Sequence, residues 1–170
     1  AAVAWVSLSD TTSLGTAGKG AIAVSRTADR HTGLRAHSGA VILQPHQTEV
    51  LRNRGMEYEK GPRKNGGVNK KYVGKDVQVI LRDAGIPCGA DKRLAVCEVD
   101  GDHPFLWTEM MMPVLPLVRV RHVDEAIDFA LEVEHGYRHT ASMHSRNIDQ
   151  LSKMALACDC SIFVKNGPTA

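Results

Sequence analysis

Strand-length apolar runs alternate with helix-period segments along most of the chain, and this alternation limits the possible folds more than any other feature. Because a strand, a helix and a second strand at these lengths form a right-handed crossover, we expect a mainly parallel sheet. We therefore predict an α/β fold with three layers, in which helices cover both faces of the sheet. The predicted strands are residues 21–25, 40–43, 93–99, 114–120, 139–145 and 161–165, and the predicted helices are residues 26–37, 45–51, 77–84, 123–131 and 148–158.

Residues 52–71 interrupt this alternation. They contain four glycines, one proline and no apolar period, which predicts a flexible loop. Seven Lys or Arg residues against two Glu residues make the loop basic. Such a loop could bind the phosphates of a nucleotide, and the alternative is an ordinary solvated connection. We find no repeat or second domain and treat residues 1–170 as one domain, which the ends of the sequence suggest is only part of a domain.

The composition excludes several classes of partner. Aromatic residues make up 5% of the chain, which is too few for a platform that stacks on nucleic-acid bases. The longest apolar runs are too short to span a bilayer, so no membrane partner is expected. The cysteines, Cys88, Cys97, Cys158 and Cys160, are placed as packing residues rather than as a disulfide framework, which indicates a reducing compartment such as the cytoplasm.

Possible metal ligands occur in two places, the pair Cys158 and Cys160 and the three histidines His135, His139 and His144. No other cysteine or histidine pair lies at zinc spacing from the two cysteines. A glycine interrupts the helical pattern between the first two histidines, and the later two fall in strand-like sequence. The residues therefore predict no metal site and favour ordinary surface or core histidines.

Residues 108–116, TEMMMPVLP, form the least regular segment of the chain. Pro113 removes a backbone donor and keeps the residue before it out of the helical region, so we predict an irregular turn that leads into the strand at 114–120. The residues alone favour a solvated loop glutamate at Glu109, followed by core methionines. The alternative is that Glu109 holds a ligand hydroxyl at the mouth of the turn.

Several further strings between Tyr72 and Pro168 are long and specific in combination. With TEMMMPVLP, they resemble the CoA-acylating branch of the aldehyde dehydrogenase superfamily, the propanediol- and ethanolamine-utilisation type. The resemblance is fainter between residues 21 and 51. The strings are YVGKD at 72–76, HPF at 103–105, VDEAI at 123–127, HTA at 139–141, MHSRNID at 143–149 and SIFVKNGP at 161–168.

The resemblance implies an aldehyde-dehydrogenase-like catalytic domain that uses NAD or NADP and converts a small aldehyde and CoA to acyl-CoA. It implies that Glu109 binds the nicotinamide ribose hydroxyls. It also makes His139, Thr140 and Met111 candidates for the substrate and CoA channel. Family members form homo-oligomers, and some lie inside bacterial microcompartments. The resemblance therefore implies a location in the cytoplasm or in a microcompartment lumen.

The sequence departs from the family pattern at the nucleophile. Family members attack the aldehyde with a cysteine in a short loop, and the counterpart here, TTSLGTAGK at 11–19, places Gly15 or Thr16 at that position. Glycine has no nucleophile, and an unassisted threonine hydroxyl is far weaker than a thiolate. The Rossmann-like cofactor domain of the family is also expected to be absent from these residues. We therefore expect the chain alone to be inactive, and the alternative is a non-catalytic pseudoenzyme that serves as an assembly or binding module.

Overall fold

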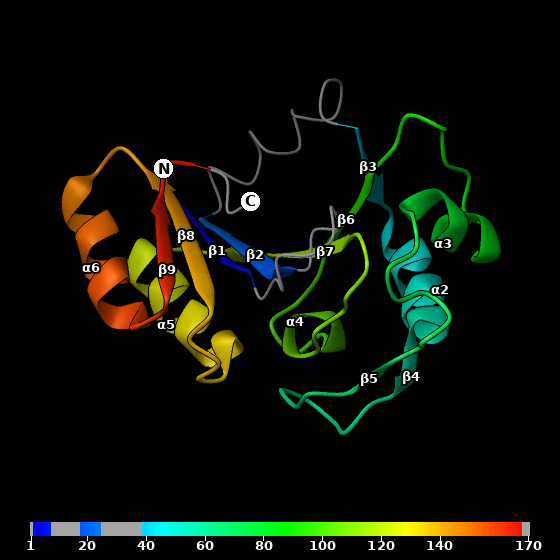
Figure 1. The fold of residues 1–170 in the computed structure, drawn as a ribbon, viewed down its shortest axis with the longest axis horizontal. Helices are drawn as coiled ribbons and strands as arrows, with labels where there is room; N and C mark the ends of the chain where they lie inside the picture. The colour runs from blue at the N-terminus through cyan, green and yellow to red at the C-terminus, as the bar shows by residue number, and fades with distance from the viewer. Residues whose placement is uncertain (1, 8–17, 25–38, 168–170) are drawn as a thin grey trace.

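One seven-stranded sheet forms the centre of the protein (Figure 1). The computed structural model describes residues 2–7, 18–24 and 39–167. The strands lie in the order β3-β6-β7-β2-β1-β8-β9. Their bounds are Ala2–Ser7 for β1, Gly18–Val24 for β2, Ala40–Leu43 for β3, Leu94–Glu98 for β6, Val114–Val120 for β7, Thr140–Ser145 for β8 and Ile162–Lys165 for β9.

The sheet is mainly parallel, as predicted. Strands β3, β6, β7 and β2 pair with one another in parallel, and so do β8 and β9. Strand β1 lies between β2 and β8 and is antiparallel to both. The six other described strands of this sheet therefore run in one direction, and β1 runs against them. The sequence analysis did not predict β1, because its short apolar run has no alternation of polar and apolar residues.

Five helices connect the strands within the described residues. The amphipathic spacing that predicted α5 and α6 places their apolar residues against the sheet. Asn147 caps α6, since its side chain accepts hydrogen bonds from the backbone N–H groups of Asp149 and Gln150 at 2.9 and 3.3 Å. The helices are α2 (Pro45–Gly55), α3 (Val77–Asp83), α4 (Pro104–Trp107), α5 (Val123–Glu134) and α6 (Ile148–Cys158).

The buried side chains form two hydrophobic clusters that meet along β7. Val114 belongs to the cluster around α2 and α3, and Val118 and Val120 belong to the cluster around α5 and α6. Because alternate residues of a strand point to the same face, both clusters lie on one face of β7. The predicted helix at 26–37 lies outside the described residues, and the three-layer arrangement stays a prediction.

Residues 52–71 are more ordered in secondary structure than the sequence analysis predicted. Helix α2 continues to Gly55, and β4 (Met56–Tyr58) pairs with β5 (Gly67–Val68) to form a β4–β5 hairpin. The hairpin runs beneath α4 in Figure 1. Arg63 near its tip forms ion pairs with Asp102 and Glu132 at 2.7 and 2.8 Å. The missed hairpin is held by contacts that are distant in sequence, which a local count of glycines cannot reveal.

Candidate functional site

The strand register brings the predicted site segments to one edge of the sheet. The turn that contains Glu109 leads into the start of β7, and His139 and Thr140 lie at the start of β8. The last residue of β1, Ser7, pairs with both Thr140 and Gly18, which begins β2. Strands β7, β2, β1 and β8 are neighbours in this order. The two residues that bracket positions 8–17, Ser7 and Gly18, therefore lie at the same edge as the other candidates.

The predicted nucleophile positions, Gly15 and Thr16, fall in this bracketed segment and lie outside the described residues. The register fixes only where the segment leaves β1 and where it enters β2. Ser7, where the segment leaves β1, pairs with Thr140, and Gly18, where it enters β2, pairs with Ser7 on the other side. The interpretation of Gly15 or Thr16 as the nucleophile position stays a prediction.

The Glu109 turn consists of alternately exposed and buried side chains. Glu109 is exposed, and Met110 and Met112 are buried in the cluster around α2 and α3. Met111 is 47% exposed and has a φ of 49°, in the left-handed region. An unbranched side chain tolerates this conformation better than a β-branched one would. The expectation of an irregular turn is confirmed, and two of the three methionines are core residues.

Two backbone amides from the segment after α2 hold this turn. The N–H of Gly66 donates to Thr108 Oγ1 at 3.0 Å, and the N–H of Gly74 donates to the carbonyl of Met111 at 3.0 Å. Thr108 is 2% exposed, so its hydroxyl bond lies away from water. The residues on both sides of Glu109 and Met110 are therefore tied to the same neighbouring segment.

His139 and Thr140 form a side-chain pair at the start of β8. The Nδ1 atom of His139 lies 2.8 Å from Thr140 Oγ1, within hydrogen-bond distance. Thr140 is buried and His139 is half-buried. The contact fixes the orientation of the imidazole ring. His144, farther along the same strand, is exposed.

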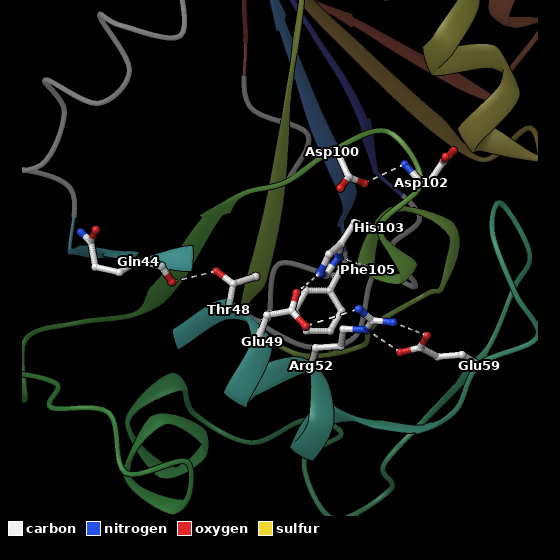
Figure 2. Close-up of polar contacts among 9 residues, drawn as sticks. All are labelled: Gln44, Thr48, Glu49, Arg52, Glu59, Asp100, Asp102, His103 and Phe105. Carbon is white, nitrogen blue, oxygen red and sulfur yellow. Dashed lines mark hydrogen bonds and ion pairs between the residues drawn. The ribbon is translucent and has the colours of Figure 1, made fainter. Parts of the chain in front are cut away.

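A buried histidine begins the helix that precedes the Glu109 turn (Figure 2). His103 is 7% exposed, and its Nδ1 accepts a hydrogen bond from the backbone N–H of Phe105 at 3.3 Å. Its Nε2 has no hydrogen-bond partner among the described residues and lies 3.8 Å from a carboxylate oxygen of Glu49. Since Nδ1 accepts, the ring is neutral with its proton on Nε2.

Charged groups from three segments of the chain surround this histidine. Burial, together with the positive charge of Arg52, lowers the pKa of His103, while Glu49, Asp100 and Glu59 act in the opposite direction. Arg52 binds Glu59 through two hydrogen bonds of 2.7 and 2.6 Å, as Figure 2 shows. From the sequence, the HPF string was only a family marker, and no role was predicted for His103.

The described residues contain no cluster of possible metal ligands. No group of three or more His, Cys, Asp or Glu side chains within the described ranges could hold a metal ion. Likewise, among helices of the described residues, none is long and apolar enough to cross a membrane. A shallow cavity lies at the end of α3, beside Gln78, Arg82 and Cys88, and none of the predicted site residues lines it.

No protein-family model matches the chain. It is 45% identical over 149 residues to the acetylating acetaldehyde dehydrogenase EutE of Salmonella typhimurium, across 86% of this chain and 31% of that protein. The chain thus spans about a third of the length of the curated relatives it matches.

Solved structures give the same result. The propionaldehyde dehydrogenase of Rhodopseudomonas palustris with bound propionyl-CoA is 41% identical, with a TM-score of 0.79 over 87% of this chain and 32% of that one. An engineered glycolyl-CoA reductase with bound NADP+ is 41% identical, with a TM-score of 0.78 over 86% and 32%. A propionaldehyde dehydrogenase from a fucose-utilisation bacterial microcompartment of Clostridium phytofermentans is 33% identical, with a TM-score of 0.78 over 86% and 32%. The chain therefore matches a fragment of the CoA-acylating acetaldehyde and propanal dehydrogenase family, about a third of the length of these relatives.

Proposed function

We propose that this chain provides the catalytic-domain part of an NAD- or NADP-dependent, CoA-acylating aldehyde dehydrogenase. The overall reaction converts an aldehyde, CoA and the oxidised cofactor to acyl-CoA and the reduced cofactor. The observation that carries the proposal is the common edge of the sheet shared by the Glu109 turn, the His139–Thr140 pair and the residues that bracket positions 8–17. Side chains that must meet one substrate need such a common edge.

Glu109 is proposed to bind the ribose of the nicotinamide cofactor. Its exposed carboxylate has two oxygens that accept hydrogen bonds, which suits a pair of neighbouring ribose hydroxyls. The bound nicotinamide would supply the hydride acceptor for the reaction. The chain's own contribution is to hold the ribose at the edge of the sheet and to orient the ring toward the reacting carbon.

His139, Thr140 and Met111 are proposed to line the channel for the acyl group and CoA. If the Thr140 hydroxyl donates to Nδ1 of His139, Nε2 carries the ring proton and can donate to a carbonyl oxygen. Met111 adds an exposed, adaptable apolar surface beside Glu109. The basic residues of the β4–β5 hairpin would then lie nearest the CoA phosphates, although Arg63 is already paired with two carboxylates.

The chain alone is proposed to be inactive. The nucleophile position falls at Gly15 or Thr16, and the loss of a covalent nucleophile lowers turnover by on the order of a millionfold. Incubation with propanal, CoA and NAD+ or NADP+ should give no reduced cofactor above buffer. A CoA-dependent rate well above buffer would show that an effective nucleophile is present.

Calorimetric titration with CoA tests whether the chain binds CoA and whether His139 contributes to the binding. CoA should bind the chain, and His139→Ala should weaken binding by about tenfold, the loss expected for one polar contact. His144→Ala is the matched control, because His144 is exposed and lies near the other end of the same strand. If His139→Ala and His144→Ala bind CoA alike, His139 has no role in the channel.

A second candidate function is an assembly or binding module of the same fold. Three apolar side chains of α6 and β9 favour it, since Ile148, Leu156 and Ile162 are 71%, 84% and 50% exposed. Self-association would also fit the expected homo-oligomer, located in the cytoplasm or in a microcompartment lumen, and the Clostridium phytofermentans relative is from a bacterial microcompartment. Sedimentation over a range of concentrations should show a dimer that Leu156→Ser weakens. A monomer at every concentration would contradict this function.

A further inference from the structure

The hydroxyl of Thr108 connects the β4–β5 hairpin to the residue before Glu109. The backbone N–H of Thr108 bonds the carbonyl of Pro104 at 3.0 Å and closes α4. Its side chain accepts a second hydrogen bond, from the N–H of Gly66 at 3.0 Å. Thr108 therefore joins two elements that are 42 residues apart in sequence, immediately before the predicted ligand-binding glutamate.

The contact requires a glycine on the hairpin side. A Cβ atom at position 66 would lie 2.7 Å from the carbonyl oxygen of Tyr58, 2.8 Å from the Met56 Cε and 3.2 Å from Thr108 Oγ1. Real Cβ atoms essentially never approach backbone atoms at the first of these distances. The hairpin backbone approaches Thr108 this closely because residue 66 has no side chain.

The far side of the turn is held in a similar way. The carbonyl of Met111 accepts a hydrogen bond from the N–H of Gly74, and Met110 and Met112, on either side of Met111, are buried. Glu109 is thus an exposed residue on a backbone that is fixed before and after it. A backbone fixed in advance loses less conformational entropy when a ligand binds than a mobile backbone does.

We propose that Thr108 is a positioning residue for Glu109, and that it acts through its hydrogen bond to the Gly66 amide. Thr108 does not touch the ligand in this account. It holds the turn so that the Glu109 carboxylate is presented at the sheet edge. The proposal rests on the proposed role of Glu109 in ribose binding, and it adds the β4–β5 hairpin to that site as a structural support.

The test uses the 170-residue chain and nicotinamide mononucleotide, which contains the ribose that Glu109 is proposed to bind. Thr108→Val keeps the shape of the side chain and removes the acceptor, and Thr108→Ser keeps the acceptor. Hydrogen exchange of the amides of Gly66 and residues 109–111 measures how firmly the bond to Thr108 holds the turn. The dissociation constant of the mononucleotide measures the effect of this bond on binding. Thermal unfolding of each variant establishes that it is folded, and Thr108→Ala replaces Thr108→Val if the valine variant does not fold.

Thr108→Val should accelerate exchange at Gly66 and at residues 109–111 and weaken binding by about tenfold, the effect of losing one buried hydrogen bond. Thr108→Ser should keep the wild-type exchange rates and the wild-type affinity for the mononucleotide. The matched control is Thr48→Val, which removes another buried threonine hydroxyl, one that donates to the carbonyl of Gln44, the N-cap of α2, at 3.3 Å. It should leave exchange at residues 109–111 and binding unchanged.

Glu109→Gln separates failure of this proposal from failure of the proposed function. It should weaken binding of the mononucleotide without changing the exchange of Gly66. If Glu109→Gln weakens binding but Thr108→Val changes neither exchange nor binding, the positioning role is wrong and the role of Glu109 stands. If Glu109→Gln leaves binding unchanged, the ribose role of Glu109 is wrong and the positioning proposal is overturned with it.

Discussion

The imidazole of His103 accepts a hydrogen bond at Nδ1 from the backbone N–H of Phe105, at 3.3 Å, and so caps the helix that leads to Glu109. Only a ring without a proton on Nδ1 can make this bond. Its surroundings lower the pKa of His103, with burial as the largest cause. Protonation of this buried ring would remove the cap and place a charge in the core.

Stability should therefore depend on pH through His103. The unfolded chain titrates near the ordinary histidine pKa of about 6.5, and it binds the proton more tightly than the folded chain does. The contribution of His103 to stability is complete above that pH, is lost as pH falls toward the lowered folded-state pKa, and changes no further below it. Urea unfolding at a series of pH values should show this loss.

Two variants test whether His103 is the group that causes this pH dependence of stability. His103→Asn keeps a capping oxygen and removes the titration, so it should flatten the slope of unfolding free energy against pH. His144→Asn, at an exposed position, should keep the wild-type slope. An unchanged slope in His103→Asn would assign the pH dependence to another group.

Arg52 should set the pH range over which the stability contributed by His103 is lost. Its positive charge lowers the pKa of His103, and it also binds Glu59 and Glu49. Arg52→Gln removes the charge and frees both carboxylates, so the pKa of His103 should rise and the loss of stability should begin to level off at a higher pH. An NMR titration of the His103 ring measures this pKa directly. A lower or unchanged pKa would contradict the account.

Much of the fold is predictable from local patterns, and each exception has a physical reason. The bounds of β3, β7 and α6 agree with the apolar runs and periods that predicted them. Strand β1 was missed because one of its pairing partners, β8, is distant in sequence. The β4–β5 hairpin was missed because contacts to residues distant in sequence, such as the bond from Gly66 to Thr108, hold it in place. The α4 turn was missed because four residues are too few to show a helical period.

The candidate site shows the same division. The residues alone predicted an exposed Glu109 and buried methionines, and both are observed, apart from Met111. The strand register that brings Glu109 and His139 to one edge could not be read from the residues, because it depends on the unexpected antiparallel β1. The roles of Thr108 and His103 depend on single hydrogen bonds to backbone amides, for which sequence carries no signal.

The three consecutive methionines should differ sharply in their effect on stability. Met110→Ala and Met112→Ala each empty a buried position, so each should lower the free energy of unfolding by about 2 to 5 kcal/mol. Met111→Ala removes a largely exposed side chain and should change it by less than about 0.5 kcal/mol. Chemical denaturation of the three variants measures these differences. Equal losses would contradict the alternation of buried and exposed residues in the turn.

The helix caps provide a second matched pair. Asn147 makes two capping hydrogen bonds at the start of α6, and Asp76 at the start of α3 makes no side-chain capping bond. Asn147→Ala should therefore cost about 1 kcal/mol of stability, and Asp76→Ala should cost clearly less. If Asp76→Ala proves the more harmful change, the interpretation of Asn147 as the stronger cap is wrong.

The account as a whole rests on a single edge of the sheet that serves as the ligand site, and chemical-shift mapping with CoA tests this most directly. Addition of CoA to the labelled chain should perturb residues 109–111 together with His139 and Thr140. Perturbations confined to the shallow cavity beside Gln78 and Cys88, with none at residues 109–111 or 139–140, would contradict it.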